Sequence, residues 1–177
     1  IQVVKDDDTT ILVLADGLGS GVKANILSTL TSKIISTMIA EHMSIEDCVN
    51  TIMATLPVCK VRGIAYSTFT IIKITNNDYA EIIQYDNPTV ILIRDGQNYE
   101  YPTETKIISG KKIIESKINL KCDDVFVVMS DGAVYAGVGQ TLNYGWQREN
   151  IVEYIEFHYD YRFSAKAIAS LVLDACN

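Results

Sequence analysis

Two apolar runs in this chain each end in a small residue followed by Asp-Gly, and this doubled motif constrains the fold most. The run 11–15 leads to Asp16, and the run 125–130 leads to Asp131. In both places the next residues are typical of a loop that enters a helix, not of a returning strand. Carboxylates at the ends of buried strands are costly to desolvate unless a positive charge lies beside them. The motif therefore predicts one or two divalent cations held at these strand ends.

The composition fits a globular protein and argues against two classes of partner. The chain has 177 residues, of which 48% are hydrophobic and 21% charged, and its net charge is −7. Because nucleic acids and anionic membranes both select basic surfaces, neither is expected as the main partner. No apolar stretch reaches the ~18 residues of a membrane-spanning helix, and no signal peptide or lipidation motif is present. We expect a single cytoplasmic domain over residues 1–177, trimmed at both ends.

The cysteines and histidines give no sign of a zinc site or a Cys/His catalytic pair. The cysteines are widely spaced and form no Cys-x-x-Cys pair. They are Cys48, Cys59, Cys122 and Cys176. With only two histidines in the chain, buried or half-buried thiols in a reducing compartment are the expected state.

The first part of the sequence predicts a hairpin followed by two helices. Residues 1–4 and 11–15 flank the acidic triplet 6–8, which is interpreted as a solvated hairpin tip rather than a cation site. Apolar residues then recur at helical spacing over 22–42. They are Ile26, Leu27, Leu30, Ile34, Ile35, Met38 and Ile39. A second helix is predicted to begin after Ser44, with Asp47 completing the cap, and to end at Pro57, so that the pair covers a sheet.

The remainder predicts a strand meander and a second helix pair. The expected strands are 64–74, 79–85, 90–94, 97–101, 113–120 and 125–130, and the expected helices are 147–159 and 164–176. Ser164 is the expected cap of the last helix, whose inner face is Ile168, Leu171, Val172 and Ala175. A third Asp-Gly, at Asp95, lies between two short strands and is interpreted as a plain hairpin turn. The fold class is α+β, a four-layer αββα sandwich of two mainly antiparallel sheets flanked by helix pairs.

The glycine-rich segment after Asp16 resembles a phosphate-binding loop only superficially. It lacks the Gly-Lys-Ser/Thr ending of a Walker loop and the spacing of the dinucleotide fingerprint. Aspartate oxygens are instead hard ligands suited to Mg²⁺ or Mn²⁺. The carbonyl of Gly17 is a further candidate ligand, and Gly19 and Gly21 permit a sharp exit into the helix. The alternative, that Asp16 and Asp131 are only turn or cap residues, remains open.

With these motifs in order, the chain resembles the sporulation stage II E type of metal-dependent (type 2C-like) protein serine/threonine phosphatase. The matching segments are 15–21, 66–70, 86–88 before the hairpin at 95–96, and 130–132. The resemblance covers almost the whole chain, and it implies the same αββα fold.

The resemblance implies catalytic roles for Asp16 and Asp131. By this resemblance Asp16 would bridge two Mn²⁺ or Mg²⁺ ions with the Gly17 carbonyl as a further ligand, and Asp131 would bind one of the ions. The resemblance further implies that the metals would activate a water for attack on the phosphorus of phosphoserine or phosphothreonine, without a phospho-enzyme. Substrate-binding residues are unknown. The family also has an acidic ligand before the first strand and an Asp-Asp pair before a final strand, which these 177 residues lack, so a partial metal site is expected.

Several further residues have two interpretations. Lys23 and Arg62 are candidates for contact with a substrate phosphate, although solvated side chains are the commoner case. Tyr144 and Trp146 belong either to a flap beside the site or, preferably, to the packing of the domain. The segment 67–70 is interpreted as core strand.

The leading hypothesis is a phosphatase acting on a phosphorylated regulatory protein in bacterial signalling, by family analogy. The alternative is a catalytically incomplete phosphatase-fold module that binds or regulates partners, with the helices of 22–56 as its interface and a possible dimer contact. A nucleotide-binding α/β protein is a third possibility, and it predicts a parallel sheet.

Overall fold

The chain forms two compact units, which we call the large-sheet unit and the small-sheet unit. The computed structural model describes residues 1–19, 21–55, 67–138 and 143–176. The large-sheet unit comprises Ile1–Asn87 and Tyr101–Leu120, and the small-sheet unit comprises Pro88–Glu100 and Lys121–Asn177.

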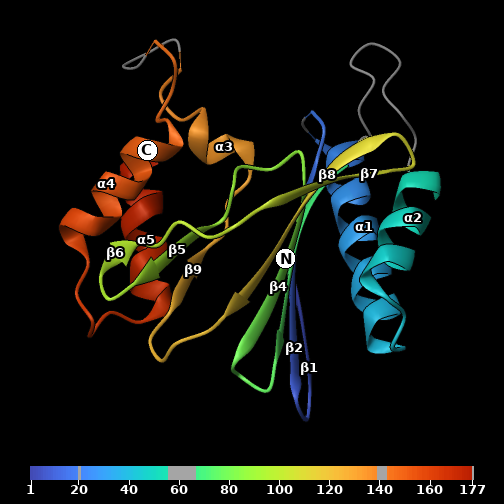
Figure 1. Ribbon diagram of the computed structural model, residues 1–177. Coiled ribbons are helices and arrows are strands. Elements are labelled where there is room, and N and C mark those ends of the chain that lie inside the picture. The colour runs from blue at the N-terminus through green and yellow to red at the C-terminus, as the bar shows by residue number, and fades with distance from the viewer. Residues whose placement is uncertain (20, 56–66, 139–142, 177) are drawn as a thin grey trace. The chain divides into compact units, whose positions relative to one another are not determined.

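The large-sheet unit is built on a six-stranded sheet in the order β1-β2-β3-β4-β8-β7, in which every neighbouring pair is antiparallel (Figure 1). The strands are β1 (Gln2–Asp6), β2 (Thr9–Gly17), β3 (Ser67–Thr75), β4 (Tyr79–Tyr85), β7 (Glu104–Ile108) and β8 (Lys111–Asn119). The predicted turn between β3 and β4 is present, and Asn76 and Asn77 adopt left-handed φ values of 53° and 58°. This geometry confirms the hairpin predicted from the Asn-Asn-Asp sequence.

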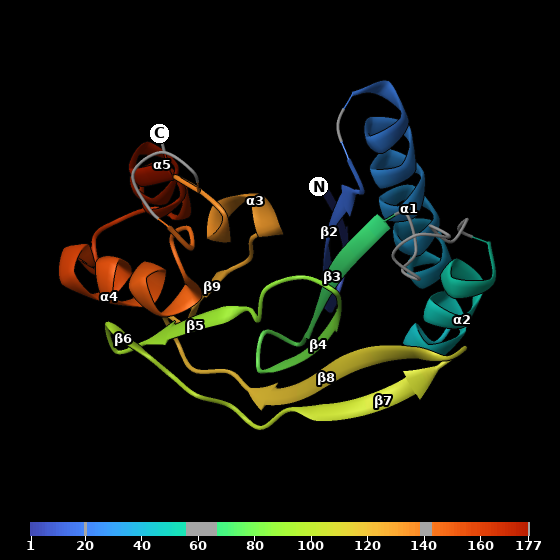
Figure 2. The ribbon, with the colours of Figure 1, turned by 90° about the horizontal axis from the view of Figure 1, so that it is seen from above.

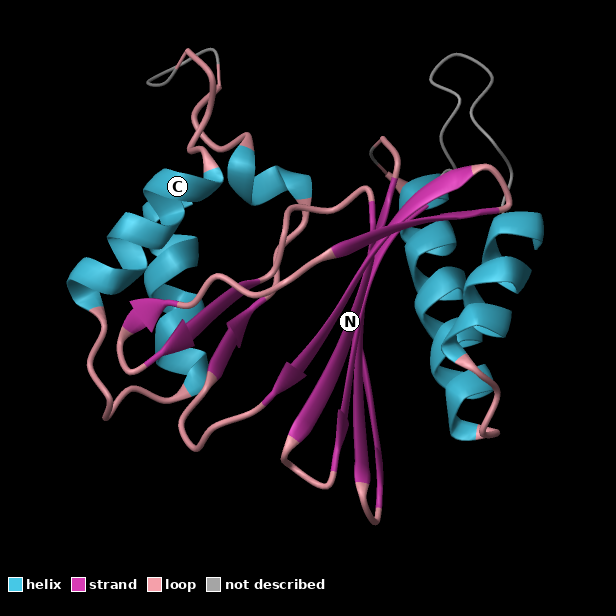
Figure 3. Cartoon of the chain, in the orientation of Figure 1, coloured by secondary structure: helices cyan, strands magenta, loops and turns pink. Residues whose placement is uncertain are grey.

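Helices α1 (Val22–Ala40) and α2 (Ile45–Thr55) cover one face of this sheet (Figures 1 and 3). The core between them is apolar and includes Val13, Ile35, Ile52, Phe69, Ile71 and Ile113. The predicted cap of α2 is confirmed, since the Asp47 amide donates to Ser44 Oγ at 3.0 Å and Ser44 Oγ donates to the Asp47 carboxylate at 2.6 Å. Pro57, the predicted end of this helix, lies outside the described residues.

The buried face of α1 differs from the predicted stripe. Ile26 and Leu30 are 58% and 46% exposed, whereas the hydroxyl residues Thr31, Ser32 and Ser36 are buried. Each of these hydroxyls donates to a backbone carbonyl three or four residues earlier in the helix, at 2.7 to 3.1 Å. Because these bonds satisfy the hydroxyls locally, small polar residues replace large apolar ones where the helix faces the core.

Strand β7 was not predicted from the sequence. It pairs with β8 through a tight turn in which Ser109 and Gly110 have φ values of 49° and 75°. Only Ile108 of its residues is buried, so the apolar alternation that reveals a half-buried strand is missing.

The small-sheet unit has much shorter strands, in the order β6-β5-β9, again antiparallel. They are β5 (Ile91–Arg94), β6 (Gln97–Asn98) and β9 (Val125–Val127). The turn at Asp95-Gly96 joins β5 to β6 with left-handed φ values of 53° and 79°, as predicted for this third Asp-Gly. The predicted strands 97–101 and 125–130 are too long, because regular pairing ends after two and three residues respectively.

Helices α4 (Arg148–His158) and α5 (Ala165–Cys176) pack on this sheet, and the four-residue α3 (Asp131–Val134) follows β9 (Figure 2). The shared core contains Ile91, Ile93, Met129, Ile151, Ile155 and Val172. Ser164 caps α5 as predicted, accepting a hydrogen bond from the Ala167 amide at 3.2 Å. The predicted inner face is wrong at Ala175, which is exposed, while Cys176 packs against the core instead.

A buried ion pair fixes the loop before β9. Arg94 Nε and Nη2 donate to the two carboxylate oxygens of Asp124 at 2.8 and 2.6 Å, and the two side chains are only 9% and 4% exposed. Burial alone would raise the pKa of Asp124, but the hydrogen bonds from Arg94 and from the Lys121 amide outweigh it and hold that pKa below its usual value. The same hydrogen bond raises the pKa of Arg94.

The predicted α+β class with antiparallel sheets and helix pairs is confirmed. Across the described ranges, no helix is both long and apolar enough to cross a membrane. Cys48 is buried, which raises the pKa of its thiol to about 11. Cys122 is exposed, contrary to the prediction of buried or half-buried thiols, because it lies in the turn before β9 rather than on an element. Cys59 lies outside the described residues.

Candidate metal-binding residues

Asp16 is the penultimate residue of β2, and its neighbours hold it by hydrogen bonds. Its backbone carbonyl accepts a bond from the buried Ser67 hydroxyl at 2.9 Å, and its Oδ1 accepts one from the Gly17 amide at 2.9 Å. Ala15 packs on the helix side of the sheet, so strand alternation directs the Asp16 side chain to the opposite face. Within the described part of the chain, Oδ2 accepts no hydrogen bond. The carboxylate is therefore held in place through Oδ1, which leaves Oδ2 available to a ligand.

Gly17 is required by the approach of α1 rather than by an unusual backbone angle. A Cβ at this position would lie 2.0 Å from the carbonyl oxygen of Ala24, in the first turn of that helix. Gly19 and Gly21 have φ values of 92° and 83°, which confirms that they provide the sharp exit predicted after the strand. The end of β2 and the start of α1 are thus packed backbone to backbone directly beside Asp16.

Asp131 occupies the corresponding position in the small-sheet unit. It is the first residue of α3, shortly after β9, and its side chain is exposed. Its carbonyl accepts a hydrogen bond from the Tyr135 amide at 2.9 Å, which closes the short helix. Both Asp-Gly pairs therefore mark the passage from a strand to a helix, as predicted, and one lies in each unit.

The donor set fits a divalent cation in kind. Asp16 and Asp131 supply carboxylate oxygens and Gly17 a carbonyl, which are the ligands that Mg²⁺ and Mn²⁺ prefer. In the ranges that the structure describes, no group of three or more His, Cys, Asp or Glu side chains is arranged to hold a metal ion.

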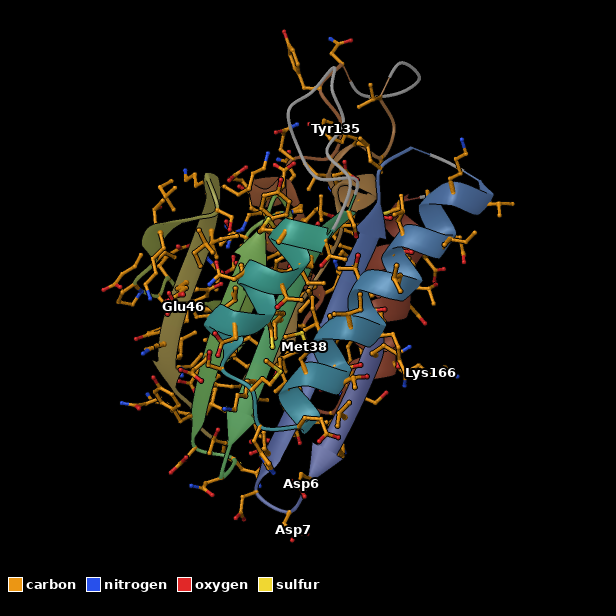
Figure 4. All side chains as sticks on the ribbon, turned by 90° about the vertical axis from the view of Figure 1, so that its right-hand side faces the viewer. Asp6, Asp7, Met38, Glu46, Tyr135 and Lys166 are labelled. Carbon is orange, nitrogen blue, oxygen red and sulfur yellow. The ribbon has the colours of Figure 1, made fainter. Side chains whose placement is uncertain are left out.

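The other acidic candidates of the sequence lie elsewhere. Asp6 and Asp7 are at the tip of the β1–β2 hairpin, at the far end of β2 from Asp16 (Figure 4). The Asp7 amide donates to Asp6 Oδ1 at 2.9 Å. This is turn geometry, and it confirms the interpretation of the triplet as a hairpin tip.

The structure tests part of the predictions for the residues that had two interpretations. Lys23 is exposed at the start of α1, and Arg62 lies outside the described residues. Trp146 packs against the core of the small-sheet unit and edge-on to Tyr154 at a centroid distance of 5.3 Å, whereas Tyr144 is exposed. Packing is thus confirmed for the tryptophan alone.

A polar row beside Asp16 was missed by the sequence analysis. Thr68 pairs with Asp16 across the sheet, and the fully buried Thr70 lies two residues further on the same face. Asn87 Nδ2 donates to Thr70 Oγ1 at 3.0 Å, while its Oδ1 is buried and has no hydrogen-bond partner among the described residues. The threonines at alternate positions of segment 67–70 could have indicated a polar row on one face of this strand. The hydrogen bond between Thr70 and Asn87, however, cannot be predicted from the sequence.

Comparison with known proteins places this architecture in a known class. Residues 6–177 match the family model of stage II sporulation protein E (SpoIIE). Comparison with the curated proteins gives no match.

Three solved structures resemble the chain closely in fold. The PP2C phosphatase domain of Bacillus subtilis SpoIIE, with a fragment of its regulatory domain, aligns over 99% of this chain and 51% of that one, with 17% identity and a TM-score of 0.78. The RsbU and RsbW domains of a Mycobacterium tuberculosis protein align over 96% and 47%, with 16% identity and a TM-score of 0.70. RsbX in complex with magnesium aligns over 97% and 76%, with 19% identity and a TM-score of 0.64.

The fold is thus that of PP2C-type phosphatase domains. The chain belongs to the SpoIIE family, as the sequence motifs had indicated. It spans about half the length of the first two of these structures. The parallel sheet expected of a nucleotide-binding α/β protein is absent from the described residues, in which every paired strand is antiparallel.

Proposed function

We propose that this chain is a divalent-metal-dependent protein phosphatase domain that hydrolyses phosphoserine or phosphothreonine. The observation that carries the proposal is the pair of Asp-Gly strand ends, at Asp16 and Asp131, in a chain of the SpoIIE family. A single phosphatase-like domain over residues 1–177 is part of the proposal, and the match of the family model from residue 6 to the end supports it.

In this proposal Asp16, the Gly17 carbonyl and Asp131 hold Mg²⁺ or Mn²⁺. Such an ion, when bound, supplies the Lewis acidity that makes hydroxide available near neutral pH and neutralises phosphate charge. RsbX, a structural relative, is known in complex with magnesium. The chain's own contribution is to preorganise the donors, and Ser67 and the Gly17 amide do so by fixing the carbonyl and one carboxylate oxygen of Asp16.

The exposed setting of Asp131 suits a protein substrate. Its side chain and that of Tyr135 are both exposed around α3, so a phosphorylated segment of another protein can approach without entering a deep cavity. A regulatory phosphoprotein is the proposed substrate, in keeping with the RsbU and RsbW domains that occur together in a structural relative. A role in bacterial signalling in the cytoplasm follows from the same proposal.

Mn²⁺-dependent hydrolysis of p-nitrophenyl phosphate tests the proposal. We expect turnover with manganese that is lost in Asp16→Asn and in Asp131→Asn. The matched control is Asp7→Asn, which removes the same charge at the hairpin tip and should leave the rate unchanged. Equal rates in wild-type protein and Asp16→Asn would refute the assignment.

A second candidate function is a phosphatase-fold module that binds or regulates partners without full catalysis. The observation that favours it is that, among the described residues, the acidic side chains form no group of three arranged around an ion. The helices of 22–56 are then the interface, and the exposed Ile26 and Leu30 of α1 support a dimer through this region. Binding of a partner by a protein that shows no metal-dependent turnover distinguishes this function from the first.

A further inference from the structure

A cavity of about 510 Å³ lies in the small-sheet unit, at the end of its sheet away from Asp131. The turn from β5 to β6 and the segment that leads into β9 both lie at this end, because Ile93 pairs with Val125. From there β9 runs towards α3, where Asp131 is found (Figure 1). The cavity therefore belongs to a surface distinct from the candidate metal ligands.

Tyrosine rings and carboxylates line this cavity together. Tyr159 and Tyr161 come from the connection between α4 and α5, and Asp95, Asp123 and Asp160 come from three separate turns. The Tyr159 ring is held close to the β5–β6 turn, since a Cβ on Gly96 would lie 3.3 Å from its edge. Among the described residues, neither Asp95 nor Asp123 forms an ion pair.

The residues around the two lining tyrosines include large exposed aromatic side chains. Phe157 is 84% exposed and Tyr161 is 83% exposed, and Phe163 is exposed as well. Phe157 lies in the last turn of α4, whereas Tyr161 and Phe163 belong to the connection between α4 and α5. Large apolar side chains that remain in water are a common feature of interaction surfaces, and one of these three, Tyr161, lines the cavity.

Within this unit, two arginine side chains each contact a carboxylate and a tyrosine ring. Arg94 pairs with Asp124 through two hydrogen bonds, and its guanidinium lies 4.2 Å from the centroid of the Tyr99 ring. Arg162 pairs with Asp160, which lines the cavity, and its guanidinium lies 5.8 Å from the centroid of the Tyr161 ring. A planar guanidinium satisfies a carboxylate and a tyrosine face at once, which an ammonium group does less well.

We propose that this cavity is a docking site for an arginine side chain carried by a segment of a protein partner, with apolar neighbours of that arginine resting on the exposed aromatic side chains of residues 157–163. Asp95 and Asp123, which form no ion pair among the described residues, supply the negative charge, and Tyr159 and Tyr161 supply the ring faces. The proposal does not depend on metal binding or hydrolysis, because every residue that carries it lies at the far end of the unit from Asp131.

Protection of Cys122 from alkylation measures occupancy directly, because this exposed thiol lines the cavity. The probe is the peptide acetyl-Gly-Arg-Gly-Arg-Gly-amide, used with EDTA present, against the same peptide with citrulline in place of arginine. We expect the arginine peptide to slow alkylation of Cys122 and the neutral citrulline peptide to have no effect. Added salt should weaken the protection, since the attraction is between exposed charges.

The double substitution Asp95→Asn with Asp123→Asn should raise the dissociation constant about threefold to tenfold, as expected for two partly exposed charge pairs. Asparagine tolerates the left-handed backbone that both positions adopt. Tyr161→Ala, at an exposed position, should weaken binding without affecting folding, and Asp174→Asn on the exposed side of α5 is the control. Equal protection by the citrulline peptide or by spermidine, or unchanged binding in the double variant, would overturn the proposal.

Discussion

The two units of this chain are stabilised in different ways. In the large-sheet unit, β2 and β3 pair in unbroken register from Thr9 with Thr75 to Gly17 with Ser67, and the helices bury an apolar core. In the small-sheet unit the strands contain only two to four residues, and the buried pair of Arg94 and Asp124 ties β5 to the loop before β9. Long paired strands hold their own geometry, whereas a short sheet depends on particular side chains to position the segments that leave it.

This difference bears on the two candidate ligands. Asp16 stands at the end of a long strand and is held by bonds from adjacent strand residues, while Asp131 follows a three-residue strand and is exposed. The geometry of Asp16 should therefore resist substitutions elsewhere in the chain. That of Asp131 should be sensitive to substitutions that loosen the small sheet.

The largest effect is expected in the core of the large-sheet unit. Phe69→Ala removes a fully buried ring that packs on Tyr85, and we expect a loss of about 4 kcal/mol in the free energy of unfolding. Urea denaturation measures this loss. The control Val3→Ala, on the exposed edge strand, should cost less than about 0.5 kcal/mol. A loss below about 1 kcal/mol for Phe69→Ala would show that this core does not dominate the stability of its unit.

The ion pair should matter most in the small-sheet unit. Arg94→Met leaves the Asp124 carboxylate buried without its partner, and we expect the free energy of unfolding to fall by about 3 kcal/mol. Arg162→Met breaks a pair of similar geometry at the surface and should have almost no effect on unfolding. If the two substitutions cost the same in urea denaturation, burial is not what distinguishes the pairs.

Gly17→Ala should lower the free energy of unfolding by about 2 kcal/mol, because the added methyl group would clash with the Ala24 backbone and displace the start of α1. Gly19→Ala is the matched control, because no atom lies within 4 Å of the added methyl group. Only the left-handed φ of this residue is then unfavourable for alanine, and it should lower the free energy of unfolding by about 1 kcal/mol. Thermal unfolding of the two variants compares these costs. A greater loss in Gly19→Ala would contradict the packing argument.

The smallest effect is a dependence on pH that arises from Asp124. Its pKa is lower in the folded protein than the ~3.9 of an unfolded chain, so its contribution is complete above that value and is lost as the pH falls through the folded pKa. Denaturation midpoints of wild-type protein and Asp124→Asn, measured at about pH 7 and about pH 3, should converge at the lower pH. A constant difference between them would exclude this carboxylate as the source.

The sequence was sufficient where local pattern and turn chemistry agree. Strand β4 was predicted with its observed bounds because alternating residues follow an Asn-Asn-Asp turn. The positions of Asp16 and Asp131 between a strand and a helix were predicted because each follows an apolar run. Strand β7 was not predicted, because only one of its residues is buried and the apolar alternation of a half-buried strand is therefore missing.

Other features depend on contacts that no local pattern reveals. The bond between Asn87 and Thr70 joins residues 17 positions apart, and Gly17 is fixed by a helix that packs on it from later in the chain. The burial of the hydroxyl residues of α1 was not predicted, because helical periodicity assigns the inner face of a helix to large apolar residues. Hydrogen bonds to its own carbonyls allow serine and threonine there instead.

The most direct test of the central claim, that Asp16 and Asp131 hold a catalytic divalent cation, is a manganese titration followed by electron paramagnetic resonance. Free Mn²⁺ gives a sharp signal that is lost on binding, so the measurement does not depend on turnover. We predict that the wild-type protein and Asp7→Asn reduce this signal equally, and that Asp16→Asn and Asp131→Asn each weaken the binding. Equal binding by all four proteins, or none by the wild type, would contradict the account.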